Sequence, residues 1–98
     1  MSDPYNKYDV GDSIRLKAYF KREDVLTDPT SVVLKVKDPT GATTIYDYGA
    51  SEVTRETTGT YYKDIIVEDS GRWNYRFEGS GSVTATEEYY FVVERTWF

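Results

Sequence analysis

Residues 69–77 read Asp69-Ser70-Gly71-Arg72-Trp73-Asn74-Tyr75-Arg76-Phe77, a turn followed by a strict alternation of aromatic and polar side chains. A period of two residues is typical of a β-strand that buries one face. The aromatic side chains of this stretch can each bury about 150–250 Å² in a core. We therefore expect this strand to dominate the hydrophobic core.

The same period recurs along the chain and predicts further strands at residues 13–21, 31–37, 43–48, 53–56, 60–67 and 83–95. In the last of them, Phe91 shares a face with Tyr89 and Val93. No segment has the period of an amphipathic helix. Roughly seven or eight short strands separated by turns predict an all-β fold, and the chain length favours an antiparallel β-sandwich over a barrel.

Two connections carry local predictions. Asp38-Pro39-Thr40-Gly41 has the residue preferences of a type I turn, because proline presets φ and aspartate can bond the following backbone. In the polar loop 22–30, Val25 and Leu26 are expected to cover one end of the core. The pattern of residues 60–67 leaves open which face of that strand points inward.

Size and composition limit the classes of function. A chain of 98 residues forms one domain. It has no cysteine and no histidine, which removes disulfides and the residue most used as a general base and transition-metal ligand. The net charge of −5 disfavours contact with nucleic-acid phosphates.

Targeting signals are not evident in the sequence. The first residues lack a basic start and an apolar run, and no stretch approaches the roughly 20 apolar residues of a membrane span. We therefore expect a protein that is made in the cytoplasm of its host and has no membrane partner and no direct nucleic-acid partner.

Several carboxylate pairs are candidates for a metal site or for acid catalysis. They are Asp9 with Asp12, Glu23 with Asp24, Glu68 with Asp69, and Glu87 with Glu88. A calcium site needs about six to eight converging oxygens, and no Asp-x-Asp-x-Asp-Gly loop is present. Solvated loop charge, which keeps a tyrosine-rich chain in solution, is the better interpretation. We expect no metal, no cofactor and no catalytic residue.

The two ends are expected to differ from the sandwich itself, residues 13–95. Residues 1–12 are polar and lack a sustained period, so they are interpreted as an N-terminal arm. Tyr5 and Tyr8 are candidates for docking this arm onto a neighbour, and a frayed start is the alternative.

The C-terminal tip, residues 96–98, ends on the large apolar residues Trp97 and Phe98. Such a tip gains nothing from exposure to water. Trp97 and Phe98 are therefore expected either to fold back over an open end of the sandwich or to insert into a neighbour, and we favour the neighbour.

The chain has ten tyrosines and two tryptophans, more aromatic side chains than one small core can hold. Adjacent residues of a strand face opposite sides, so Tyr61-Tyr62 and Tyr89-Tyr90 must each leave a ring outside. Exposed aromatic residues are enriched in protein interfaces and on sugar-binding platforms, and Tyr90 is a candidate for such contact. The alternative is that outward tyrosines merely suit a pleated surface.

Residues 69–75 resemble the Asp-x-Gly-x-Tyr corner that opens the sixth strand of immunoglobulin-like domains. Trp73 stands where the corner tyrosine would be, and its indole N–H can make the required hydrogen bond to the backbone. Tyr75 occupies the place of the usual second cysteine, so this is no disulfide-bonded antibody-type domain. The fold-defining residues are expected to be Asp69, Gly71, Trp73, Tyr75, Phe77 and Phe91.

Four segments together look like small immunoglobulin-like proteins encoded among the structural genes of tailed bacteriophages. The segments are Tyr8-Asp9-Val10-Gly11-Asp12, Lys37-Asp38-Pro39-Thr40-Gly41, Thr58-Gly59-Thr60-Tyr61-Tyr62 and Ser70-Gly71-Arg72-Trp73-Asn74-Tyr75-Arg76-Phe77-Glu78-Gly79. The resemblance spans about residues 8–94 and concerns turn and core positions. It implies an immunoglobulin-like antiparallel β-sandwich of roughly seven or eight strands without catalytic residues.

In such phages, domains of this type decorate the capsid or lie in the neck and tail. The expected function is therefore that of a non-enzymatic virion structural protein in a symmetric multi-copy assembly. Capsid decoration and head–tail joining are nearly equal alternatives. Its contacts with other virion proteins are expected at Tyr5, Tyr8, Tyr90, Trp97 and Phe98. A rival from another class is a carbohydrate-binding or adhesin module that recognises a cell surface through exposed tyrosines.

Overall fold

The computed structural model describes residues 7–95, and these residues form an all-β structure, as the sequence pattern predicts. The strands are β1 Lys7–Asp9, β2 Ser13–Tyr19, β3 Lys21–Arg22, β4 Val25–Leu26, β5 Ser31–Lys37, β6 Thr43–Asp47, β7 Thr54–Thr57, β8 Thr60–Ile66, β9 Gly71–Ser80 and β10 Ala85–Glu94. A 3-10 turn, η1, follows β6 at Tyr48–Ala50. The described residues contain no helix that could cross a membrane.

The described part of the chain has ten strands, more than the roughly seven or eight that the pattern predicts. The additional strands are β1, β3 and β4, with three, two and two residues. Runs this short cannot display a period of two. β1 also corrects the expected N-terminal arm, because Lys7–Asp9 pair with β10 as part of a sheet.

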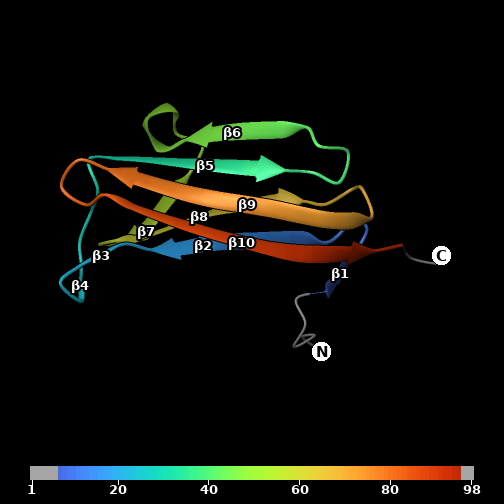
Figure 1. Ribbon diagram of the computed structural model, residues 1–98, viewed down its shortest axis with the longest axis horizontal. Coiled ribbons are helices and arrows are strands. Elements are labelled where there is room, and N and C mark those ends of the chain that lie inside the picture. The colour runs from blue at the N-terminus through green and yellow to red at the C-terminus, as the bar shows by residue number, and fades with distance from the viewer. Residues whose placement is uncertain (1–6, 96–98) are drawn as a thin grey trace.

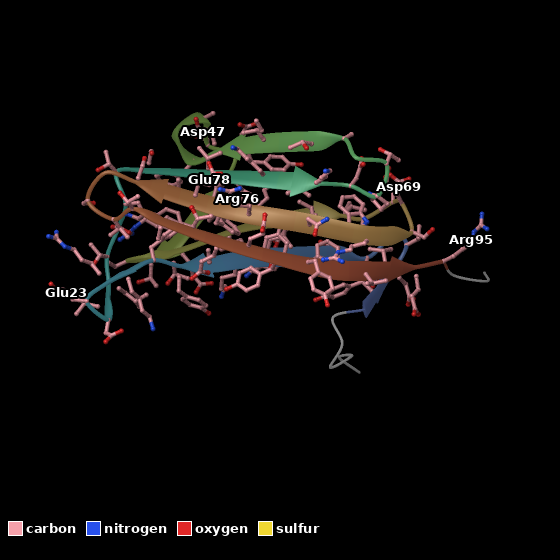
Figure 2. The ribbon with its side chains drawn as sticks, in the orientation of Figure 1. Glu23, Asp47, Asp69, Arg76, Glu78 and Arg95 are labelled. Atoms are coloured by element: carbon pink, nitrogen blue, oxygen red, sulfur yellow. The ribbon has the colours of Figure 1, made fainter. Side chains whose placement is uncertain are left out.

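Two main sheets lie face to face. The five-stranded sheet has the order β1-β10-β9-β5-β6, and the three-stranded sheet has the order β2-β8-β7. Figure 1 shows β6, β5, β9 and β10 side by side, with β8 and β2 behind them. The β3–β4 hairpin projects at one end of the long axis, where Figure 2 labels Glu23, and Asp69 lies at the opposite end.

The hydrophobic core lies between the two main sheets. Trp73 and Phe77 of β9 and Phe91 of β10 are buried, so the aromatic face predicted from the sequence is the inward face of the five-stranded sheet. In β8, Tyr61 and Ile65 are buried, which settles the face that the sequence left open. The remaining buried apolar residues are Ile14, Leu16, Ala18, Phe20, Val32, Leu34, Val36, Val53, Val67, Val83 and Val93.

The predicted turn at residues 38–41 joins β5 and β6. Asp38 Oδ1 accepts hydrogen bonds from the backbone N–H of Thr40 at 2.9 Å and of Ala42 at 3.1 Å. Gly41 has a φ of +94°, a left-handed conformation that glycine adopts without strain. The hydrogen bond from the Thr40 hydroxyl, followed by those from the backbone, holds the pKa of Asp38 below its ordinary value. The antiparallel pairing of β5 with β6 confirms the hairpin.

Val25 and Leu26 do not cover the core, so that expectation is wrong. Their exposed fractions are 63% and 39%. Glu23 and Asp24 have φ angles of 51° and 65°, which form a tight turn and pair β4 back onto β3. The hairpin thereby holds both apolar side chains away from the two sheets. Phe20, which is fully buried, contributes to the core just before this hairpin.

The corner before β9 has the hydrogen bond that its resemblance to immunoglobulin-like domains implies. Trp73 Nε1 donates to the carbonyl oxygen of Asp69 at 2.9 Å. The Trp73 ring stacks on Phe91 of β10, with ring centroids 5.9 Å apart and an interplanar angle of 11°. Gly71 has a φ of +127°, and a Cβ there would lie 2.8 Å from Pro39. Only glycine suits this close approach.

Asp28 fastens the chain after β4 to the turn between β7 and β8. Its Oδ1 accepts hydrogen bonds from the backbone N–H of Gly59 at 2.8 Å and from the Tyr61 hydroxyl at 3.1 Å. Arg55 Nη2 lies 3.0 Å from Asp28 Oδ2. The bonds from Arg55 and then Gly59 hold the pKa of Asp28 below its ordinary value, whereas burial raises the pKa of Tyr61 to about 12. No motif in the sequence indicated this cluster.

Replacing Trp73 by phenylalanine is expected to lower the free energy of unfolding by about 1–2 kcal/mol, because the Asp69 carbonyl loses its donor while a ring remains in the core. Chemical denaturation followed by circular dichroism measures the change. Tyr90→Phe, which removes an exposed hydroxyl, is the control and leaves stability unchanged. A Trp73→Phe variant as stable as the parent would contradict this role of the indole.

Replacing Asp28 by alanine is expected to lower the free energy of unfolding by about 1–3 kcal/mol, since the Gly59 N–H and the Tyr61 hydroxyl lose their acceptor. Asp64→Ala removes a carboxylate whose partner Arg15 is half exposed, and it should cost less. The folded pKa of Asp28 is lowered, so its contribution is complete above about pH 4 and disappears as the pH falls through the folded pKa. Denaturation measured across acidic pH tests this, and a parent-minus-variant difference that stays constant with pH would refute it.

Candidate binding site

Among the described residues, 7–95, nothing covers a seam that runs between the two main sheets. β2 is an edge strand, because it pairs with β8 alone. β10 pairs with β9 along Ala85–Val93, but β1 covers its other edge only at Val92–Glu94. We call the space between residues 85–91 of β10 and residues 13–19 of β2 the open seam.

The edge of β10 that faces away from β9 has no strand partner along the open seam within residues 7–95. The carbonyl of Glu94 accepts a hydrogen bond from the Val10 N–H at 3.2 Å, so the peptide groups of Glu94 point to the β1 side. Because these groups alternate between the two edges of a strand, Thr86 and Glu88 direct theirs to the same side. No strand of the described part of the chain pairs with them there.

A large hollow lies in the open seam next to the β3–β4 hairpin. Its volume is about 610 Å³, and it is lined by Tyr19, Lys21, Leu26, Ala85, Glu87 and Tyr89. Tyr19 is 50% exposed and Tyr89 is 47% exposed, although Tyr89 lies on the same face of β10 as the buried Phe91. The hollow is therefore an apolar groove with one acidic and one basic side chain.

A smaller hollow of about 80 Å³ continues the seam toward β1. Tyr89 lines both hollows, and the smaller one is also lined by Tyr8 and Phe91. The Tyr8 ring meets Phe91 edge-on, with centroids 5.6 Å apart, and so closes the seam where β1 lies. The two hollows therefore lie one after the other along β10, and the smaller one is next to the residues that pair with β1.

Charge in the two hollows of the seam comes from Glu87, Lys21 and Arg15 rather than from the tyrosines. The Tyr89 hydroxyl donates to Glu87 Oε2 at 3.0 Å, and this bond, with some burial, raises the pKa of Tyr89. Burial raises the pKa of the neighbouring Tyr75 to about 12. Both phenols therefore remain neutral near pH 7.

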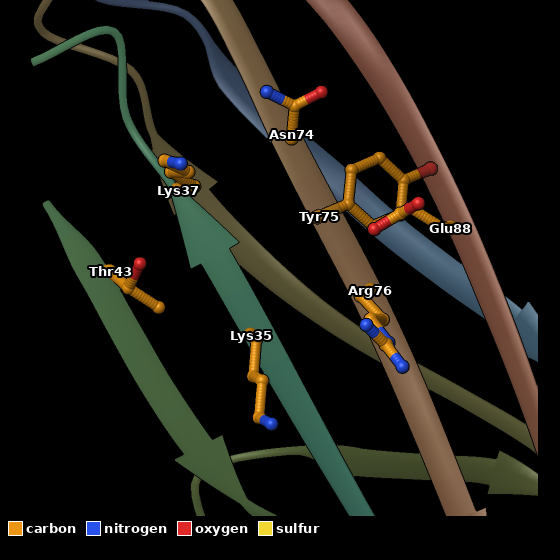
Figure 3. A pocket seen from close by; sticks show the side chains of 7 residues that line it. All are labelled: Lys35, Lys37, Thr43, Asn74, Tyr75, Arg76 and Glu88. Atoms are coloured by element: carbon orange, nitrogen blue, oxygen red, sulfur yellow. The ribbon is translucent and has the colours of Figure 1, made fainter. Parts of the chain in front are cut away.

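A second, shallower depression lies on the outer face of the five-stranded sheet and is shown in Figure 3. It has a volume of about 160 Å³ and is lined by Lys35, Lys37, Thr43, Asn74, Tyr75, Arg76 and Glu88. Lys35 Nζ and Arg76 Nε lie 3.3 Å and 3.0 Å from the same oxygen of Glu78, which partly neutralises them. Figure 2 labels Arg76 and Glu78 near the middle of the sheet. This depression is smaller than the hollow of about 610 Å³ in the open seam, and four of its seven lining residues are charged.

Two of the carboxylate pairs noted in the sequence lie in turns between strands. Asp12 Oδ2 accepts a hydrogen bond from the Asp9 N–H at 2.9 Å in the turn after β1. Glu23 and Asp24 form the tip of the β3–β4 hairpin. Within residues 7–95, no three histidine, cysteine or acidic side chains are grouped so that they could hold a metal ion.

The structure places the predicted interface residues differently. Tyr5, Trp97 and Phe98 lie outside the described residues. Tyr8 is half-buried and packs against the core, and its contact with a neighbour stays a prediction. Tyr90 is 54% exposed on the outer face, where the Arg72 guanidinium lies 4.1 Å from its ring centroid. Both Tyr8 and Tyr90 line the smaller hollow.

Sequence reasoning missed Tyr19, Leu26 and Tyr89 as site residues. The pair Tyr89-Tyr90 predicts at least one outward ring, and the structure exposes both, Tyr89 by 47% and Tyr90 by 54%. The period of a strand assigns a face and does not reveal whether another strand covers it. Comparison with family models, curated proteins and solved structures finds no match to this chain.

The open edge has a signature in amide hydrogen exchange. The amides of Thr86 and Glu88 should exchange rapidly, whereas those of Glu87 and Tyr89, which point toward β9, should be protected. Residue-resolved exchange measured by nuclear magnetic resonance checks this alternation. Equal protection at all four amides would mean that the edge is covered.

Proposed function

We propose that the chain is an immunoglobulin-like β-sandwich that acts as a non-enzymatic structural subunit of a virion. Three features support this fold assignment. β1 runs parallel to β10, β10-β9-β5 and β2-β8-β7 lie in opposing sheets, and the Trp73 indole makes the corner hydrogen bond. This arrangement is compatible with the inter-sheet packing of such domains, and the sequence has no cysteine for their disulfide.

The open seam is the observation that carries the binding role. It combines a groove of about 610 Å³ with exposed aromatic and aliphatic side chains and an unpaired strand edge. A lone domain that leaves such an edge uncovered risks aggregation. A partner that covers the seam in an assembly removes this risk.

The chemistry of the described residues favours binding over turnover. The pKa values of Asp28, Asp38 and Asp64 lie below their ordinary value, and the pKa values of Tyr61 and Tyr75 are raised to about 12. None of these shifts brings a side chain toward neutral pH, where a general acid or base works best. The groove itself contains one carboxylate, Glu87, already bonded to Tyr89.

The virion context rests on the resemblance to small immunoglobulin-like proteins of tailed bacteriophages. Within a virion, the chain binds other virion subunits, either as a decoration of the capsid or as part of the head–tail neck. A symmetric assembly presents many copies of the neighbouring subunit, so weak contacts at each seam add up through multivalency.

A carbohydrate-binding or adhesin role is the second candidate. Tyr19 and Tyr89 line one groove, and aromatic rings with a polar tip are suited to sugar faces. The exposed Tyr90 lies on the outer face of the sheet instead, so the tyrosines do not form one flat row.

Sedimentation of virions from cells that produce an epitope-tagged copy tests the structural role. The tagged chain is expected to travel with the particles through a density gradient and to resist a salt wash. A tagged chain found only in the soluble fraction, together with binding of one sugar class on a glycan array, would favour the adhesin role instead.

A further inference from the structure

We propose that the open seam binds an extended segment of a different protein. This segment pairs with the edge of β10 along residues 85–91, next to the part of the same edge where β1 pairs. This mode of binding presupposes the assembly role proposed above and specifies the contact through which it occurs. The occupant lies along residues 85–91 and alternates apolar side chains, which face the seam, with basic side chains, which face outward.

The unpaired peptide groups of β10 determine that the occupant is an extended polypeptide. Thr86 and Glu88 present N–H and C=O groups at a spacing of about 6.6–6.8 Å, which is the repeat of two residues in a strand. Another strand offers acceptors and donors at the same repeat. β1 already uses this edge at Val92–Glu94, so the added strand continues an existing ladder.

The hollows determine which side chains face inward. Ala85, Glu87, Tyr89 and Phe91 follow one another along the inner face of β10, and the two hollows lie beside them. Alternate side chains of an added strand point to the same face and are spaced to enter successive hollows. The walls formed by Tyr19, Leu26 and Tyr89 favour apolar side chains there.

Charge determines which side chains face outward and which partner is excluded. Glu88 points to the outer face and forms no ion pair within residues 7–95, so a basic residue opposite it is favourable. A second copy is a poor occupant, because antiparallel pairing of two β10 edges about Glu88 sets the two carboxylates against each other. Each copy also carries a net charge of −5.

Peptides of about seven residues, the length of the uncovered edge, test the inference in the full chain. The probe is the capped peptide Lys-Val-Lys-Val-Lys-Val-Lys, and the matched control has the same composition with its valines clustered. The alternating peptide is expected to bind at least about tenfold more tightly and to slow exchange of the Thr86 and Glu88 amides. Equal affinities would show general attraction to charge and overturn the inference.

Two peptide variants test the hydrogen bonds without changing the protein. N-methylation of the backbone nitrogens on one edge of the alternating peptide removes its donors on that edge. Because a strand bonds through one edge at a time, methylation of one edge should abolish binding while methylation of the other should leave it. If both methylated peptides still bind, strand addition is overturned.

Two protein variants test the same edge from the other side. Glu88→Pro removes a backbone N–H that points away from β9, and proline is tolerated at edge positions of this kind. It is expected to weaken binding of the alternating peptide by about tenfold or more, whereas Glu88→Gln, which removes only an exposed charge, should weaken it about two- to fivefold. Unchanged binding by a folded Glu88→Pro variant would contradict the inference, and the methylated peptides decide the matter if that variant does not fold.

The outcomes separate this inference from the proposed function. Failure of every peptide to bind, while the tagged chain still travels with particles, overturns strand addition and leaves the structural role standing. If the alternating peptide binds but the tagged chain never enters particles, strand addition stands and the structural role in a virion is overturned. A soluble glycan that perturbs the Tyr19 and Tyr89 rings without protecting the Thr86 amide would assign the groove to a sugar and overturn strand addition.

Discussion

The peptide groups of a β-strand point alternately to its two edges, and only another strand pairs with all of those on one edge. β10 is ten residues long, but the strand beside its outer edge, β1, has three. This mismatch in length shapes the molecule. Within residues 7–95, it leaves the peptide groups of residues 86, 88 and 90, which point to this edge, without a strand partner at the place where the two sheets are not closed over the core.

The rest of the fold holds this edge in place. Trp73 bonds the Asp69 carbonyl and stacks on Phe91, which fixes β10 against β9 at the end of the sheet where β1 adds. Tyr8 then packs edge-on against Phe91 and closes the seam there. Two residues further along the same face of β10, Tyr89 is 47% exposed and lines the groove. The aromatic contacts therefore lie where β1 covers β10, and the groove lies where β1 does not cover it.

The strands of the scaffold could be predicted from the sequence, but most residues of the groove could not. The strand around Trp73 and the turn at residues 38–41 depend on local period and turn chemistry, which adjacent residues display. The exposure of Val25 and Leu26 depends on positive φ angles at residues that are not glycine, which no pattern predicts. The exposure of Tyr89 depends on where a strand distant in the sequence stops, which the period of β10 itself does not show.

The central claim is that the edge of β10 is a place where another polypeptide continues the sheet. Nuclear Overhauser effects between the alternating valine–lysine peptide and the protein test it most directly, because they report which backbone protons lie side by side. The account predicts a ladder of contacts from the peptide to the backbone of Thr86 and Glu88, with valine methyl groups near the Tyr89 ring. Contacts confined to the outer-face depression around Lys37 and Arg76, or contacts to side chains alone, would contradict it.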